Sequence, residues 1–405
     1  MTSWTPVDLL PGLYAGALAA LLWAALRRWY DAVPARVLAV FSVALLILFG
    51  PVLFGGKLLL PLDNVRGLAP FQRMPEVEPH GNLLQGDLLL LIQPSLAAVR
   101  LQLGEGRWPL WNPWVGAGMP LLADPQSQAL QPIALAALPM SWPRAAGVMA
   151  TLRVLLALTL SFLWIRRQGL GEGPALAGAL AFGLGGFVIL WLGWPMANSA
   201  ALLPAVLYGL VRGRQEGGRR DFLLLSLATL ALLLGGHPET ILYALGLCLL
   251  YDARRMAPAL VLAGAVAAPA LLPFVDYLPQ TLRASRELDP PRGGLAEHWL
   301  PIVAPNAYGN SRYVEYWGLS NTNEDASGFC GSVTLLAFVL ALWTGRRLPQ
   351  ERLFLGVAVV CLLLLSPWGP GTRRLLLPLA FSLSYLGACT LERVRLGELR
   401  PQSVF

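Results

Sequence analysis

Residues 145–167 read AAGVMATLRVLLALTLSFLWIRR, an apolar run that contains one internal charge, Arg153, and ends at Arg166 and Arg167. A helix of about 20 such residues spans the roughly 30 Å of hydrocarbon in a bilayer. Similar runs recur along the whole 405-residue chain, in which 56% of the residues are hydrophobic and 13% are charged. Soluble proteins have about 25% charged residues, so the sequence predicts an all-α polytopic integral membrane protein. A soluble enzyme, a disordered chain, a coiled coil and a disulfide-rich secreted domain are excluded.

Arginine, proline and glycine residues separate the apolar runs into about eleven candidate transmembrane helices. Their predicted ranges are 7–26, 37–60, 145–165, 174–193, 198–211, 221–236, 239–252, 257–275, 329–344, 352–366 and 375–391. We expect residues 1–405 to form a single transmembrane domain. No basic segment precedes the first run and no small-residue cleavage site follows Leu26, so we expect this run to be retained rather than removed as a signal peptide.

The basic residues indicate how these helices are oriented. Lys57 is the only lysine among 30 basic residues, and the arginines concentrate in alternate short loops. These loops contain Arg27, Arg28 and Arg36; Arg166 and Arg167; Arg212, Arg214, Arg219 and Arg220; Arg254 and Arg255; Arg346, Arg347 and Arg352; and Arg393, Arg395 and Arg400. Because such loops stay in the cytoplasm, the pattern predicts an outer N-terminus and a cytoplasmic C-terminus, with Arg373 and Arg374 as exceptions. The distribution of the arginines therefore indicates membrane topology rather than a nucleic-acid-binding surface.

This orientation places two long polar loops, residues 61–144 and 276–328, on the extracytoplasmic side. All three histidines and most of the acidic residues fall on that side, so we expect function there. Residues 86–103 have an amphipathic pattern that is typical of a helix lying in the membrane interface. Residues 107–126 are rich in tryptophan, proline and glycine, which favours a segment that folds back onto the membrane surface. Together, residues 86–126 are predicted to form an interfacial lid.

Several short motifs in these loops resemble a known family. The matching residues are Leu60-Pro61-Leu62-Asp63, Gly86-Asp87, Gln93-Pro94, Gly106, Pro109-Leu110-Trp111-Asn112-Pro113, Gly116, Gly118, Pro120-Leu121-Leu122-Ala123, Pro125-Gln126, Gly236-His237-Pro238-Glu239-Thr240, Tyr243-Ala244, Tyr316-Trp317-Gly318 and Asn323-Glu324. They resemble bacterial YfhO-like membrane proteins, which look like polytopic glycosyltransferases of the C-type fold (GT-C). At position 124 this chain has aspartate where the resemblance leads us to expect asparagine.

The resemblance implies an enzyme of the bacterial cell envelope, located in the inner (cytoplasmic) membrane. Such an enzyme moves a sugar from a polyprenyl-phosphate donor to an extracytoplasmic acceptor, which is a polymer, a glycolipid or a protein. Membrane lipids are the other expected partners, and no nucleic acid is expected.

Inverting transfer needs a carboxylate that takes the proton of the acceptor hydroxyl. The resemblance implies that an aspartate of the first outer loop has this role, and we favour Asp87 over Asp63. The alternative for Asp87 is a helix N-cap, and for Asp63 it is plain solvation at the interface. Asp63, Asp87 and Glu324 could in principle gather Mg²⁺ or Mn²⁺, but no spacing requires a metal, so we predict neither a metal site nor a cofactor.

The departing lipid phosphate needs cationic or hydrogen-bonding partners. His237 is the first candidate, because polar groups at membrane depth are costly and tend to be functional. Arg66, Arg292 and Arg312 could assist it, and Glu239 could orient it. The alternatives are that His237 caps a helix junction, that Glu239 is a first-turn acid favoured by the helix dipole, and that the arginines contact lipid headgroups.

Trp111, Asn112 and Gln126 complete the predicted substrate-binding set. Trp111 could stack on a sugar, but tryptophans at the interface are commonly membrane anchors. Asn112 could bind a sugar hydroxyl or could hold the backbone of its loop.

Two other function classes stay open. A lipid or polysaccharide transporter, or a flippase, would have charged residues along a path through the helices. Apart from Arg153, Asp221 and Asp252 the predicted helices are almost free of charge, which argues against ion-coupled transport. A catalytically silent membrane scaffold is the third class.

Overall fold

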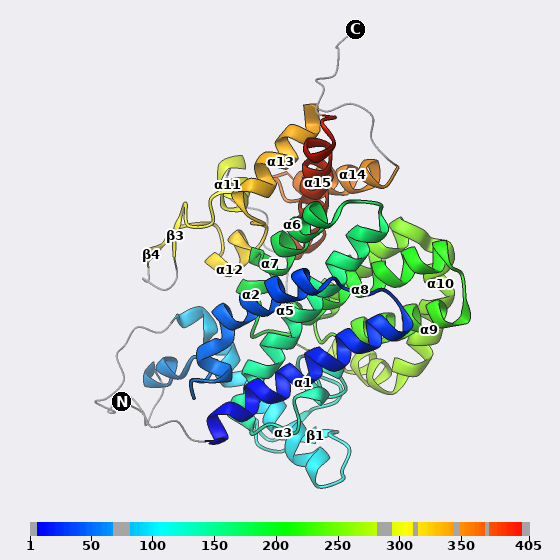
Figure 1. Ribbon diagram of the computed structural model, residues 1–405. Coiled ribbons are helices and arrows are strands. Elements are labelled where there is room, and N and C mark those ends of the chain that lie inside the picture. Colours follow the sequence, from blue (N-terminus) through cyan, green and yellow to red (C-terminus); the bar gives the residue numbers. More distant parts are fainter. Residues whose placement is uncertain are drawn as a thin grey trace.

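The computed structural model describes residues 6–67, 82–281, 294–310, 315–343, 349–368 and 372–398. These residues form a helical assembly with two short β-hairpins in the loops (Figure 1). The predicted all-α class is confirmed. The long or apolar helices are α1 (Pro6–Trp29), α2 (Ala35–Leu53), α5 (Trp142–Arg167), α6 (Glu172–Gly183), α7 (Gly186–Leu190), α8 (Met196–Gln215), α9 (Arg219–Leu233), α10 (Pro238–Tyr277), α13 (Ser332–Trp343), α14 (Pro349–Leu364) and α15 (Leu376–Leu396).

Within the described ranges, six helical segments are long and apolar enough to cross a membrane. They are Leu9–Trp29, Ala35–Leu53, Trp142–Arg167, Glu172–Leu190, Pro238–Gln280 and Arg373–Leu396. The chain is therefore consistent with a helical membrane protein. The total of about eleven spans, which counts shorter apolar helices as well, stays a prediction.

The longest helix, α10, contains a sharp break. Asp252 has non-helical backbone angles (φ −160°, ψ 81°), which divide α10 into two arms. The arms correspond to the predicted segments 239–252 and 257–275. The predicted segment 174–193 is likewise divided, because α6 ends at Gly183 and α7 begins at Gly186.

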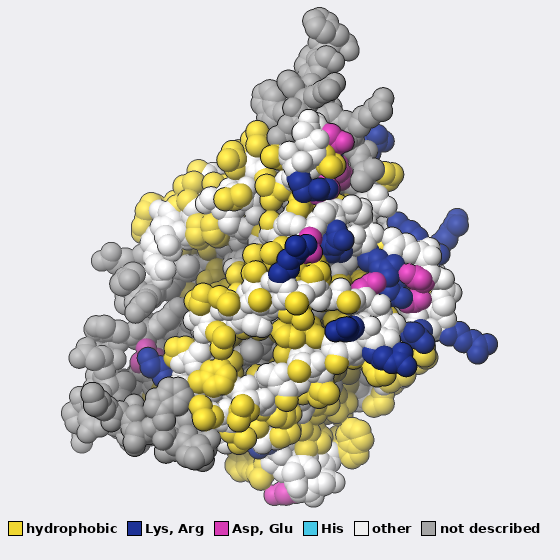
Figure 2. Space-filling view, viewed as in Figure 1, with side chains coloured by type: hydrophobic (Ala, Val, Ile, Leu, Met, Phe, Trp, Pro, Cys, Tyr) yellow, Lys and Arg dark blue, Asp and Glu magenta, His cyan; other side chains and the backbone are white. Residues whose placement is uncertain are grey.

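The core lies around α5, which Figure 1 shows at the centre of the molecule. In the apolar 18-residue stretch of α5, 94% of the positions are buried, and in that of Arg373–Leu396 the share is 89%. In the corresponding stretches of α1 and α2 only 28% are buried. Trp164 of α5 is fully buried, and its ring contacts those of Phe354, Phe381 and Tyr385. The outward apolar side chains of α1 and α2 cover the face seen in Figure 2, as expected for helices that face lipid.

The arginine-rich loops meet at one end of the molecule, where Figure 2 shows dark blue side chains gathered near the ends of α8, α9 and α10. Asp31, between α1 and α2, forms ion pairs with Arg167 and Arg212. Arg212 also pairs with Asp221 at 2.7 Å. Burial raises the pKa of Asp31, but hydrogen bonds from Arg167 and Tyr208 outweigh that effect and hold the pKa below its usual value. We call this region the arginine end.

The two long loops lie at the other ends of these helices, which we call the loop end. The first loop contains η1 (Leu62–Gly67), η3 (Leu83–Gln85), the π-helix η4 (Leu88–Ile92), α3 (Gln93–Gly104), β1 (Trp111–Asn112), β2 (Met119–Pro120), η5 (Pro125–Ser127) and α4 (Pro132–Ala136). The second loop contains η6 (Leu278–Gln280), α11 (Leu295–Val303), β3 (Gly309–Asn310), β4 (Glu315–Tyr316) and α12 (Thr322–Ala326), and η8 (Arg373–Leu375) precedes α15. Residues 107–126, predicted to fold back onto the membrane surface, contain the β1–β2 hairpin. The position of this hairpin relative to a membrane stays a prediction.

Candidate functional site

The tryptophan-rich hairpin is held by its own polar groups. Asn112 is buried, and its Oδ1 accepts a hydrogen bond from the backbone N of Trp114 at 3.1 Å. The carbonyl of Trp111 accepts one from Gln102 of α3 at 2.8 Å. Asn112 therefore holds the loop backbone, which is the structural role considered above. The Trp111 side chain is half exposed, and its indole lies against Gly118, where a Cβ would come within 2.4 Å of Nε1.

The two aspartates predicted as general bases lie on neighbouring segments. Asp63 is partly exposed in η1, and Asp87 is exposed just before η4. Asp87 makes no capping hydrogen bond with its side chain. Asn64 donates a hydrogen bond to the carbonyl of Asn82 at 2.8 Å, which ties η1 to the segment that leads to Asp87.

The predicted phosphate ligands are only partly described. Arg292 and Arg312 lie outside the described residues, and of Arg66 only the backbone in η1 is described. His237 is buried and is the N-cap of α10, where its Nδ1 accepts from the backbone N of Thr240 and lies 2.7 Å from Thr240 Oγ1. His237 therefore has the capping role considered above, and its contact with phosphate stays a prediction. Glu239 follows in the first turn of α10.

Two of the sequence motifs come together at this turn. Gly236 has φ +90°, and a Cβ there would lie 2.9 Å from the carbonyl O of Pro125 and 3.1 Å from Gln128 Cγ. The Gly235–Glu239 turn therefore packs directly on η5 and the residue after it. Gln126, in η5, is partly exposed, and its backbone N donates to Asp124 Oδ1 at 3.0 Å.

Beneath this contact lies a buried arginine. Arg153 of α5 is 2% exposed and donates to Asn198 Oδ1 at 2.8 Å, to Gln128 Oε1 at 2.8 Å and to the carbonyl of Leu192 at 2.6 Å. Asn198 also donates to Gln128 Oε1 and to the carbonyl of Gly235, at 2.8 and 2.9 Å. In the part of the chain that the structure describes, no carboxylate pairs with Arg153. A buried cation with only neutral partners is costly, which marks this network as a candidate site.

Gln128 is held in a strained conformation. Its φ of 56° makes it the only described residue other than glycine with a positive φ. Such a backbone costs roughly 1–3 kcal/mol and persists where the surroundings determine it. Here the two bonds to Gln128 Oε1 supply that constraint.

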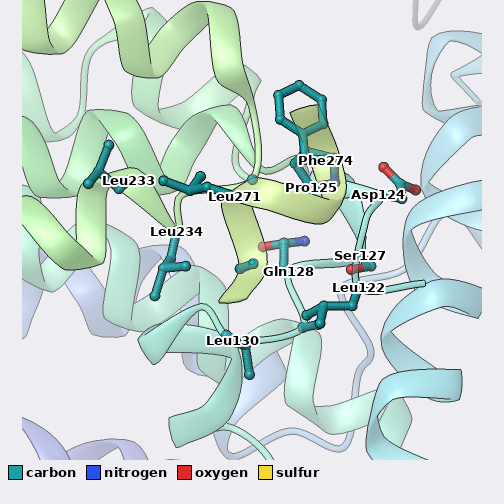
Figure 3. Close-up of a pocket in the computed structure, with 13 residues that line it drawn as sticks. Leu122, Asp124, Pro125, Ser127, Gln128, Leu130, Leu233, Leu234, Leu271 and Phe274 are labelled. Atoms are coloured by element: carbon teal, nitrogen blue, oxygen red, sulfur yellow. The ribbon is translucent and has the colours of Figure 1, made fainter. Parts of the chain in front are cut away.

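The strained residue borders a small cavity of about 40 Å³. Figure 3 shows Ser127 and Gln128 on one side of this cavity, with Leu271 and Phe274 of α10 on the other. Gln128 Nε2 and Ser127 Oγ are buried and have no hydrogen-bond partner among the described residues. Asp124 also lines the cavity; burial raises the pKa of its carboxyl, although the bond from Gln126 opposes the shift.

A second charged cluster joins the second long loop to η8, just before α15. Arg373 Nε lies 3.0 Å from Asp325 Oδ1, an ion pair that lacks hydrogen-bond geometry, and Arg374 bonds to Glu324 at 2.7 Å. The Arg374 guanidinium lies 4.4 Å from the Trp191 ring centroid. The two arginines that depart from the charge rule are therefore neutralised by acids of the second loop. Glu324 pairs with an arginine, and within the described ranges no group of His, Cys, Asp and Glu could hold a metal.

An apolar groove of about 460 Å³ lies close to this cluster. It runs between the first arm of α10 and α14, and Leu375 of η8 closes its loop end. Tyr243 lines the groove, and its hydroxyl accepts a hydrogen bond from Thr372 Oγ1 at 3.4 Å. Arg352 of α14 also lines the groove, whereas Arg373 and Arg374, which directly precede Leu375 in the chain, are not among its lining residues.

Comparisons with protein-family models, curated proteins and solved structures find no match to this chain. Function is therefore inferred from the geometry described above.

The sequence indicated some of this site and missed the rest. Arg153 stands out as a charge inside an apolar run, and the Gly235–Glu239 turn stands out as a motif. Asn198 and Gln128 were not identified as functional candidates. An asparagine at the start of an apolar segment was the available signal for Asn198, whereas no local pattern marked Gln128.

Proposed function

We propose that this protein is a membrane glycosyltransferase that moves a sugar from a polyprenyl-phosphate donor to an extracytoplasmic acceptor. The observation that carries the proposal is an apolar groove whose loop end lies at Leu375, the residue that follows a pair of arginines in the chain. Its volume of about 460 Å³ lies within the range of roughly 300–1,000 Å³ that ligand pockets occupy. A prenyl chain matches the lining, which is apolar except for Tyr243 and Arg352. Arg374 Nη1, which has no hydrogen-bond partner among the described residues, is available to a phosphate oxygen.

The arginine pair suits the leaving group. A glycosyl phosphate that departs as polyprenyl phosphate gains negative charge, and fixed cations at that point lower the barrier. Arg373 and Arg374 are held in place by their acidic partners, so they need little rearrangement when the charge develops. The hydroxyls of Thr372 and Tyr243 lie at the same end of the groove. His237, six residues before Tyr243 on α10, is the next candidate for this contact.

The remaining features of the proposal come from the sequence. About eleven spans would place the loop end outside the bacterial inner membrane and the arginine end in the cytoplasm. Residues 86–126 would lie over the site as a lid, with Trp111 in the interface. Asp87 and Asp63 are the carboxylates predicted to take the acceptor's proton.

The test fills the groove without disturbing the fold. Gly246 lines the groove, and a Cβ there meets nothing within 4 Å, so the side chain of Gly246→Leu should extend into the groove without a clash. Gly264 in the other arm of α10 is equally open and does not line the groove, so Gly264→Leu is the matched control. The assay uses purified protein in liposomes, with polyprenyl-phosphate glucose as the donor probe and polyprenyl phosphate as the binding probe.

We expect Gly246→Leu to weaken binding of polyprenyl phosphate about tenfold, a loss of roughly 1.4 kcal/mol, and to slow sugar transfer, while Gly264→Leu behaves as wild type. Wild-type transfer by Gly246→Leu would refute the groove as the donor site. Binding of the lipid without any transfer by the wild-type protein would instead favour the flippase.

A further inference from the structure

A pocket of about 190 Å³ opens at the arginine end, where α8 leads into α9 and where α10 is broken. Part of its lining is the turn that contains Gly213, Gly217 and Gly218, and another part is Arg254 and Arg255 of α10. The pocket shares no lining residue with the apolar groove or with the small cavity. It lies among the dark blue side chains that Figure 2 shows near the ends of these helices. It is therefore a separate space at the opposite end of the molecule from the two long loops.

The break in α10 places two helix N-termini at this pocket. Gly218 is the N-cap of α9. The second arm of α10 begins after Asp252, whose Oδ1 accepts from the backbone N of Arg255 at 3.3 Å. The first N–H groups of a helix have no partner within it, and the helix dipole favours negative charge there. Because both helices begin at the same pocket, their dipoles act in the same sense as the arginines.

The acid that lines the pocket is already engaged. Among the described lining residues this acid is Asp221, which is buried. Its Oδ1 pairs with Arg212 at 2.7 Å, and its Oδ2 accepts from the backbone N of Gly218 at 3.4 Å. Its negative charge is therefore balanced by Arg212, which does not line the pocket.

The two lining arginines keep positive charge available. Asp252 Oδ2 is shared between Arg255 at 3.1 Å and Arg214 at 3.4 Å. Arg254 is exposed and has no acidic partner in the part of the chain that the structure describes. Two arginines beside one another, one of them unpaired, suit a phosphate group, which can accept several charge-assisted hydrogen bonds.

The pocket also has an apolar side that continues along the helices. Phe222 of α9 is 38% exposed, and Pro258 of α10 lines the pocket with it. One turn beyond Pro258 lie Val261 and Leu262, which are 72% and 40% exposed. These residues lie in helices that the sequence predicts to face lipid. A soluble phosphate would leave this apolar side unused, whereas a phospholipid would use both the arginines and the apolar side.

We propose that this pocket binds an anionic membrane phospholipid, with its phosphate between Arg254 and Arg255. Its acyl chain would lie along Phe222, Val261 and Leu262. Basic residues at the cytoplasmic surface attract anionic lipids in general, but this pocket adds two helix N-termini and an apolar path. The site does not depend on the proposed sugar transfer, so either proposal can fail without the other.

The double variant Arg254→Gln/Arg255→Gln removes both cations that line the pocket. Arg27→Gln/Arg28→Gln is the matched control, because it removes the same charge from the last turn of α1 at the same end of the molecule, and neither residue lines the pocket. Arg254→Gln alone is the second test variant. It leaves the ion pair between Arg255 and Asp252 in place, so weaker binding by this variant cannot come from the loss of that pair.

Native mass spectrometry of the full chain, released from neutral detergent, measures the binding of phosphatidylglycerol. At the strength typical of one basic residue, we expect Arg254→Gln to weaken binding about fivefold and the double variant about 25-fold. Arg27→Gln/Arg28→Gln should bind as wild type. An equal loss in this control would indicate diffuse attraction to charge, and wild-type binding by the double variant would exclude the pocket; either result would overturn the proposal.

Two further ligands identify the chemical source of the phosphate. Phosphatidylcholine with the same acyl chains should bind about tenfold more weakly, because its choline cation would meet the arginines. Millimolar inorganic phosphate should not displace phosphatidylglycerol, since it has no chain for the apolar side. Displacement would assign the pocket to a soluble phosphate, and equal binding of phosphatidylcholine would show that the anionic headgroup is not recognised. Both outcomes contradict the proposed lipid.

A phosphatidylglycerol with a photoreactive diazirine in its acyl chain locates the bound lipid in liposomes. We expect crosslinked peptides that contain Phe222, Val261 or Leu262, and fewer of them in the double variant than in Arg27→Gln/Arg28→Gln. Crosslinks mainly to α1 and α2, whose apolar side chains are also exposed, would place the lipid elsewhere and overturn the proposal.

Discussion

Replacing Asn198 with leucine should destabilise the protein more than its apolar setting suggests. Asn198 is fully buried and joins Arg153, Gln128 and the carbonyl of Gly235 through three hydrogen bonds. Leucine has the same branching at Cγ but leaves Arg153 Nε and the Gly235 carbonyl without these partners. At about 1–3 kcal/mol for each unsatisfied buried group, the loss is roughly 2–6 kcal/mol. The apolar side chain returns about 1.5–3 kcal/mol, so the midpoints of the two ranges give an expected net loss of roughly 2 kcal/mol.

Thr229→Val is the matched control for this substitution. Thr229 is also fully buried in an apolar helix, but its hydroxyl donates only to the carbonyl of Leu225 one turn earlier. That carbonyl lies within α9, so valine should leave no unsatisfied backbone group and change stability by less than about 1 kcal/mol. Unfolding by SDS in mixed micelles measures both variants. A free energy of unfolding for Asn198→Leu equal to that of Thr229→Val would refute the network as a stabilising element.

Two further predictions concern the arginine end and the topology. Asp31→Asn should lower the free energy of unfolding at neutral pH by about 1–3 kcal/mol, because it removes charged hydrogen bonds from Arg167 and Tyr208. The folded-state pKa of Asp31 is lowered, so its contribution is present above the unfolded value of 3.8 and is lost as pH falls through the folded value; unfolding curves in acid should therefore converge for wild type and variant. All four native cysteines are buried, so a membrane-impermeant maleimide should label Trp114→Cys in intact cells and Glu216→Cys only after permeabilisation. The reverse labelling would contradict the proposed orientation.

The sequence predicted the helices better than it predicted their partners. The apolar ranges depend on local composition, and the structure has helices at these ranges. The helix ends differ from the predicted ends where proline, glycine or capping residues terminate a helix. The predicted segment 37–60, for example, ends at Leu53, two residues after the internal Pro51 and just before Gly55 and Gly56. The ion pair between Asp31 and Arg167 joins residues 136 positions apart, and no local pattern specifies such a pairing.

The candidate site shows the same division between local and distant information. The sequence marked the Gly235–Glu239 turn and residues 125–126 as separate motifs, and the fold brings them into contact through Gly236. Asp87 and Asp63 were predicted as general bases because they are the aspartates of the family-like motifs in the first outer loop, yet Asp87 is exposed. Asp124 lines the small cavity and burial raises the pKa of its carboxyl, in an environment that depends on helix ends more than a hundred residues further along the chain.

The junction between α7 and α8 contacts both the network around Arg153 and the charged cluster at η8. The carbonyl of Leu192 accepts a bond from Arg153, which also donates to Gln128 beside the small cavity. Trp191 lies against Arg374, and the carbonyl of Leu190 accepts a bond from Asn323 of the second loop at 3.3 Å. Consecutive residues of one short segment therefore contact both the buried network around Arg153 and the arginine pair of the second cluster. The proposed sugar transfer depends on how donor and acceptor are aligned. A shift of this junction should therefore impair the transfer even though the junction supplies no reacting group.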